Sequence, residues 1–268
     1  MLLFYRSPRV ADIFSCRRYC AVYTWPMLIN SLVGVLCILC VSMLVQATFS
    51  FGGALIALPL LAFVIAIPQA TSLMTMLSST IALTIMMKNR RDIQVGNAWR
   101  LIVSACVGIP FGIFFLGQVN GRMLKIVLAV TVIVFTVINL FSFKALRITN
   151  HDYAYGFGFI SGIFGGAYNI SGPPVVLYGT LSDWSPARFR ATIQSYAFFT
   201  NIFAIAGHAL AGNITTDVLI YYVCALPIVA LSVWLGNLIH AKIPAERYTL
   251  VVKLLLLALA IRLLASVI

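Results

Sequence analysis

Long apolar runs recur along the chain, separated by short polar or basic stretches. The runs cover about 27–48, 53–67, 69–87, 100–118, 122–143, 153–167, 173–182, 190–211, 217–239 and 247–267. A helix of about 20 apolar residues crosses a bilayer, and backbone groups in lipid must be paired internally. The runs are continuous and do not alternate as barrel strands do. We therefore predict an all-α integral membrane protein, a polytopic helical bundle of about seven or eight spans.

Two places interrupt this helical pattern. The run 53–67 is short and lies between Phe51-Gly52-Gly53 and Pro68, and the runs 153–167 and 173–182 are separated by a Gly- and Pro-rich stretch. Glycine and proline both interrupt helices, and these runs are too short to cross a bilayer alone. The pattern predicts broken or re-entrant helices at both places.

The two interruptions share a sequence motif. Phe51-Gly52-Gly53-Ala54 recurs as Phe164-Gly165-Gly166-Ala167, and three long apolar segments follow each copy. We predict an inverted repeat, with a basic N-terminal tail at 1–26, a first membrane repeat at 27–147 and a second at 148–268. Interrupted segments in corresponding positions of two halves indicate the binding site of a transporter. The two breaks are therefore expected to approach each other near mid-membrane.

Composition excludes a soluble domain. The chain is 62% hydrophobic and 9% charged, whereas soluble domains are about 45–50% apolar and about 25% charged. The net charge of +12 comes from Lys and Arg clustered between the apolar runs, which is the distribution that positive-inside topology produces. No basic patch is interleaved with aromatic residues, so no nucleic-acid partner is expected. We expect a multi-pass protein of the cytoplasmic (inner) membrane, in contact with the lipid bilayer.

Acidic residues are few, and none lies in the middle of an apolar run. They are Asp12, Asp92, Asp152, Asp183, Asp217 and Glu246. Cation pumps and proton-coupled carriers usually keep a carboxylate at membrane depth, so this distribution argues against cation transport and favours a small anionic solute. The sequence has no metal-spaced His cluster and no paired carboxylates in one segment, so we expect no catalytic residue, metal or cofactor.

Helix N-termini at the breaks are the expected anion site. The first turn of a helix leaves unpaired N–H groups and a partial positive charge, and glycine lets the backbone approach a ligand. The candidate substrate contacts are Gly52, Gly53, Gly165, Gly166, Asn169, Ser171 and Gly172. The alternative is close helix packing through small residues. We favour binding at the second break, which adds Asn169 and a Pro pair, and packing at the first. If Gly166 contacts the ligand, Gly166→Leu abolishes transport while membrane insertion stays normal.

Polar residues also interrupt the apolar segments that follow each break. These residues are Thr71, Ser72, Ser78 and Ser79 in one half and Gln194, Ser195 and Asn201 in the other. Among them, Ser72, Gln194 and Ser195 are taken as further substrate contacts, with hydrogen bonding between helices as the alternative role. His208 lies in a mostly apolar run and is the titratable candidate there.

The duplicated Gly-Gly break followed by Pro, the sequence Pro68-Gln69-Ala70-Thr71-Ser72, and the later Leu226-Pro227 and Leu235-Gly236 pairs form a familiar combination. With these motifs the chain resembles the sulfite exporter TauE/SafE family of membrane permeases, from about residue 30 to the C-terminus. The resemblance implies export of sulfite, a sulfonate or a related organic anion, with the Gly-rich breaks near the substrate. A non-transporting assembly or scaffold protein and a membrane-embedded enzyme remain alternatives, and the oligomeric state is open.

Overall fold

The computed structural model describes residues 32–48, 52–88, 95–140, 152–182, 184 and 186–240, and the regular structure in these ranges is helical. The helices are Leu32–Thr48, α2 (Gly53–Leu61), α3 (Ile67–Lys88), α4 (Val95–Gln118), α5 (Gly121–Leu140), α6 (Tyr153–Tyr168), α7 (Gly172–Leu181), α8 (Pro186–Leu210) and α9 (Thr216–His240). The all-α prediction is confirmed. The predicted tail at 1–26 and the last apolar run lie outside the described residues.

Within these ranges, three helices are long and apolar enough to cross a membrane. They cover Ile67–Met87, Trp99–Gln118 and Thr216–Gly236, and a shorter apolar helix covers Leu32–Thr48. Large apolar side chains such as Phe114 are exposed on the outside of the bundle, where contact with lipid would cover them. The count of about seven or eight spans stays a prediction.

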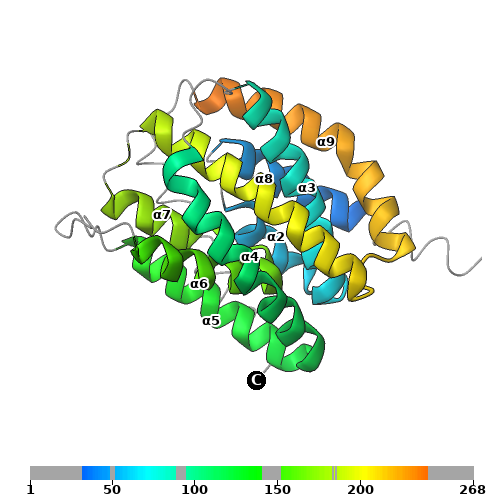
Figure 1. Cartoon of the computed structure of the whole chain (residues 1–268). Helices are drawn as coiled ribbons and strands as arrows, with labels where there is room; N and C mark the ends of the chain where they lie inside the picture. Colours follow the sequence, from blue (N-terminus) through cyan, green and yellow to red (C-terminus); the bar gives the residue numbers. More distant parts are fainter. Residues whose placement is uncertain are drawn as a thin grey trace, which may run out of the picture.

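Helices from the two predicted halves alternate across the bundle. In Figure 1, α9, α3, α8, α4 and α6 follow one another, and the contacts α3 with α9, α3 with α8, α4 with α8 and α4 with α6 agree. The helices α3 and α4 belong to the predicted first repeat, and the other three belong to the second. Both helices of the first repeat, α3 and α4, thus pack against helices of the second repeat. Such a pattern fits two related halves, although the duplication and its boundary stay predictions.

Glycines bring α4 and α6 into close contact. Gly158, Gly162 and Gly166 recur every four residues of α6, so they share one helix face. A Cβ atom on Gly162 or Gly166 would overlap a backbone carbonyl oxygen of α4, and one on Gly108 or Gly112 of α4 would overlap a carbonyl oxygen of α6. Close approach through small residues is a common way to pack helices in membranes. The two helices run in the same direction, because later residues of α6 meet later residues of α4.

The second predicted break is a helical hairpin. The helix α6 ends at Tyr168, Asn169 adopts a left-handed conformation with φ 51°, and α7 begins at Gly172. The ring of Tyr178 in α7 lies 5.7 Å from that of Phe157 near the start of α6. The chain therefore turns back at Asn169 and returns toward the side from which α6 came.

The first predicted break is likewise a helix interruption. Gly52 has φ 93°, and the nine-residue helix α2 begins directly after it. Glycine adopts this left-handed conformation without the steric cost that a Cβ atom brings. The predicted interruption of the helices is thus found at both places, and re-entrance into the membrane stays a prediction. The repeated tetrapeptide, however, differs in position: its first copy lies at the break itself, whereas Gly165 and Gly166 lie inside α6.

Candidate functional site

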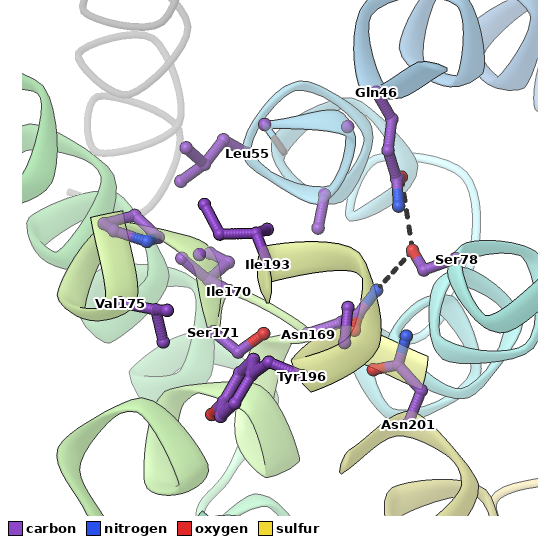
Figure 2. A pocket seen from close by; sticks show the side chains of 16 residues that line it. Gln46, Leu55, Ser78, Asn169, Ile170, Ser171, Val175, Ile193, Tyr196 and Asn201 are labelled. Carbon is purple, nitrogen blue, oxygen red and sulfur yellow. Dashed lines mark hydrogen bonds between the residues drawn. The ribbon is translucent and has the colours of Figure 1, made fainter. Parts of the chain in front are cut away.

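The two breaks meet at one small cavity with a volume of about 40 Å³. The two breaks thus approach each other, as predicted, and their position near mid-membrane stays a prediction. The cavity is lined by Gln46, Gly52, Gly53, Ala54, Leu55, Ser78, Asn169, Ile170, Ser171, Gly172, Pro173, Val175, Ile193, Tyr196, Ala197 and Asn201. Figure 2 shows these side chains converging from both halves of the chain. Ser78 and Asn201 lie well inside the long helices α3 and α8, so the cavity is in the interior of the bundle.

The first turn of α2 faces this cavity. Gly52, Gly53, Ala54 and Leu55 all line it, and no side chain caps the helix at Gly52. The N–H groups of a first helical turn have no acceptor within their own helix, and they carry the positive end of the helix dipole. No atom lies within 4 Å of the place where a Cβ of Gly52 would stand. The α2 N-terminus thus borders the cavity, and the N-terminus of a helix is a common place for an anion to bind.

The first turn of α7 offers fewer backbone donors. It begins Gly172-Pro173-Pro174, and proline has no N–H group. The second break contributes to the cavity mainly through the side chains of Asn169 and Ser171. The first break is therefore the better source of backbone donors, while the second break, where the sequence favoured binding, contributes polar side chains.

A chain of hydrogen bonds crosses the cavity wall between the two halves. The Nδ2 group of Asn169 donates to Ser78 Oγ at 2.9 Å, and the Ser78 hydroxyl donates to Gln46 Oε1 at 3.2 Å, as the dashed lines in Figure 2 show. The backbone N–H of Asn169 also donates to the carbonyl of Gly165 at 2.8 Å, which holds the turn after α6. These bonds fix the orientation of the Asn169 amide at the cavity.

A second set of hydrogen bonds supports the other side of the cavity. The hydroxyls of Ser161 and Tyr196 lie 2.8 Å apart, and the Ser161 hydroxyl also donates to the carbonyl oxygen of Ser171. Tyr196 is fully buried in α8 and lines the cavity. This set ties the second break to α8.

Half of the residues chosen from the sequence lie together at the cavity. Gly52, Gly53, Asn169, Ser171 and Gly172 all line it. A Cβ atom on Gly53 would overlap the side-chain oxygen of Gln46, so this glycine makes room for a polar group of the lining.

The other chosen residues lie elsewhere. A Cβ on Gly165 would stand 3.1 Å from the Cβ of Ser171, and Gly166 packs against the backbone of α4. Ser72 donates to the backbone carbonyls of Gln69 and Asn213, each at 3.0 Å. Gln194 and Ser195 are buried in α8 and do not line the cavity. These positions fit the packing and hydrogen-bonding roles that the sequence left open as alternatives.

Four polar side chains of the lining were not among the substrate contacts chosen from the sequence. Ser78 and Asn201 stood out as polar interruptions, but Gln46 and Tyr196 did not. Gln46 is a polar residue in an apolar helix shortly before the break, and that position was a usable signal. Tyr196 had no comparable signal, because a tyrosine in an apolar helix is common at many depths.

The cavity has a neutral lining. Among the described residues that line it, none is Lys, Arg, His, Asp or Glu. Of the acids within the described ranges, Asp152 lies at the start of α6 with an oxygen 3.6 Å from Arg100, and Asp217 is exposed in the first turn of α9. His208 is buried with its Nδ1 atom 3.0 Å from the Asn213 amide, and it does not line the cavity.

A helical bundle in which two broken helices meet at an interior polar cavity has the architecture of a membrane permease. The family model described as sulfite exporter TauE/SafE matches residues 34–263, most of the chain, and the chain belongs to this family. The resemblance found in the sequence is thereby confirmed. Membership implies an integral membrane transporter of the sulfite or small-anion type. Among curated proteins and among solved structures, no match was found.

Proposed function

We propose that this protein exports a small anion, sulfite or a related sulfur oxyanion, across the cytoplasmic membrane, and that the anion binds in the cavity between the two breaks. The observation that carries the proposal is the first turn of α2, which faces a cavity whose described lining is otherwise neutral. The protein acts as a multi-pass permease of about seven or eight spans and not as an enzyme.

The lining supplies hydrogen-bond donors that replace those of the water molecules around a hydrated anion. Backbone N–H groups at a helix start and side-chain amides are hydrogen-bond donors, and hydrogen bonds to charged groups contribute about 1.5–3 kcal/mol each. The α2 dipole adds about 0.3–1 kcal/mol, and up to about 2 kcal/mol in a partly buried geometry. No buried carboxylate of the described lining repels the anion. Together these terms support binding that is reversible, as transport requires.

The position of the cavity supports alternating access. Its polar lining comes from both halves, with Gln46 and Ser78 on one side and Asn169 and Asn201 on the other. Movement of one half against the other around a central site is a common transport mechanism. Such a movement would break and remake the bonds from Asn169 to Ser78 and from Ser78 to Gln46.

A neutral site also indicates the source of energy. An anion bound by neutral donors carries its own charge across the membrane, and outward movement from a negative interior gains about 2.3 kcal/mol per elementary charge per 100 mV. We therefore propose that the membrane potential drives export.

The test is efflux of labelled sulfite from proteoliposomes that contain the full-length protein. We expect faster efflux than from protein-free liposomes. Ser78→Ala removes the centre of the hydrogen-bond chain and should weaken apparent affinity about fivefold, which corresponds to about 1 kcal/mol for one hydrogen bond. Thr84→Ala is the matched control on the same helix, because Thr84 is exposed and bonds only to its own helix. Efflux no faster than from protein-free liposomes would contradict the proposal.

A further inference from the structure

The amide of Asn201 is an unpaired polar group at the cavity. Its side chain is 5% exposed, it lines the cavity, and Figure 2 shows its amide directed toward Asn169. Its neighbours Asn169, Ser78 and Tyr196 each make a side-chain hydrogen bond, whereas Asn201 makes none with the described residues. The amide borders the open space of the cavity, where a ligand can reach it. The cavity therefore holds an amide with both donors and its acceptor available to a ligand.

The charge of the lining limits the charge of that ligand. Within the described part of the wall there is no cationic side chain, so only neutral dipoles offset the loss of hydration. The stabilisation by dipoles rises in proportion to the ligand charge, whereas the desolvation penalty rises with the square of that charge. A second negative charge therefore costs more than it gains in this cavity.

The size of the cavity limits the ligand further. A volume of 40 Å³ has room for about three water molecules, each of which needs about 10–15 Å³ by this measure. An inorganic oxyanion or a one-carbon sulfonate has a size of this order, whereas a longer organic anion is too large for the cavity.

We propose that the cavity selects small, singly charged oxyanions over doubly charged ones, with the Asn201 amide as a specificity-determining contact. This inference rests on the proposed function, since it names the substrate class of the same cavity. For a solute that exists in both forms near neutral pH, the protein binds the monoanion.

The experiment compares methanesulfonate with sulfate, which have the same tetrahedral shape and nearly the same size but differ in charge. Binding of each is measured by isothermal titration calorimetry on the purified full-length protein at constant ionic strength. We expect methanesulfonate to bind at least about tenfold more tightly than sulfate, a difference of about 1.4 kcal/mol. Sulfate that binds as tightly as methanesulfonate, or more tightly, would overturn the charge selection while leaving the anion-transport function intact.

Two variants test the contact itself. Asn201→Leu removes the amide and should weaken methanesulfonate binding roughly ten- to hundredfold, as expected for one hydrogen bond to a charged group. Asn201→Asp keeps the shape, adds a negative charge and should abolish binding of both anions. The control Phe203→Leu lies on the same helix with its side chain 45% exposed and should bind as the unmodified protein does. Thermal unfolding shows that each variant is folded.

The outcomes separate the two proposals. Asn201→Asp that is folded and binds methanesulfonate like the unmodified protein would refute the role of Asn201, whatever Asn201→Leu does. If neither anion binds to the unmodified protein and sulfite efflux is also absent, the proposed function fails together with this inference.

Discussion

Gly166→Ala tests whether the repeated Gly-Gly motif serves packing or binding. The Cβ of the new alanine would overlap the carbonyl oxygen of Ile109 and stand 3.1 Å from its carbonyl carbon. Backbone atoms cannot rotate away as a flexible side chain can, so α4 and α6 must separate by roughly 1 Å to restore ordinary contact. A gap of that size forfeits about a quarter to a half of the dispersion attraction between the atoms that it separates.

The expected cost follows from two opposed effects. Overpacking a close contact costs about 1–3 kcal/mol, and replacing glycine by alanine inside a helix returns about 0.5–1 kcal/mol. We expect a net loss of about 1–2 kcal/mol in the free energy of unfolding, measured by titration with a denaturing detergent in mixed micelles. The control is Gly156→Ala on the same helix, where no atom lies within 4 Å of the new Cβ. It should be neutral or stabilising by up to about 1 kcal/mol.

Gly166→Leu should then reduce the amount of folded protein, which differs from the expectation drawn from the sequence. That expectation was normal insertion with loss of transport, on the hypothesis that Gly166 contacts the ligand. If Gly166→Ala unfolds like the unmodified protein but no longer moves sulfite, packing against α4 is the wrong explanation and a contact with the substrate is the right one.

Three further outcomes are expected. Asn169→Ala should weaken apparent affinity for sulfite about fivefold in the efflux assay, because it removes the bond to Ser78 and costs about 1 kcal/mol; unchanged affinity would place the substrate elsewhere. Gly52→Ala should lower stability by about 1–2 kcal/mol, since Gly52 has φ 93° and a Cβ is strained there, whereas Gly34→Ala, with open space around it, should not. With equal pH on both sides of the proteoliposomes, an imposed potassium-diffusion potential should accelerate anion movement toward the positive side; a rate that ignores the potential but follows a pH gradient would point to His208 as a proton relay.

Much of the fold could be predicted because its causes are local. Long apolar runs form helices in lipid since their backbone groups have no other partner, and the observed helices follow those runs closely. Gly52 marks the first interruption because the turn there needs a left-handed residue. The second interruption is centred on Asn169, which tolerates the same conformation better than most residues. The repeated Phe-Gly-Gly-Ala sequence predicted the region of this interruption, but it did not identify Asn169 as the residue at the turn.

The roles of single site residues depend on distant parts of the chain. The bond from Ser78 to Gln46 joins residues 32 apart in the sequence, and the bond from Asn169 to Ser78 joins residues 91 apart. Helical periodicity relates positions three or four residues apart, so it gives no information on such pairs. For this reason the sequence alone does not predict that Gln46 and Ser78 line the cavity.

The sequence by itself determined that the chain is helical, that it belongs in a membrane, where its helices break, and that its acids avoid the middle of the apolar runs. These properties follow from residue type and spacing along a single helix. Only the tertiary structure decided that Gly166 faces α4, that the first turn of α2 faces the cavity, and that Asn201 reaches it unpaired. A helix start or a glycine has the same local conformation whether it serves packing or ligand binding. The segment that packs against it decides which of the two roles it has.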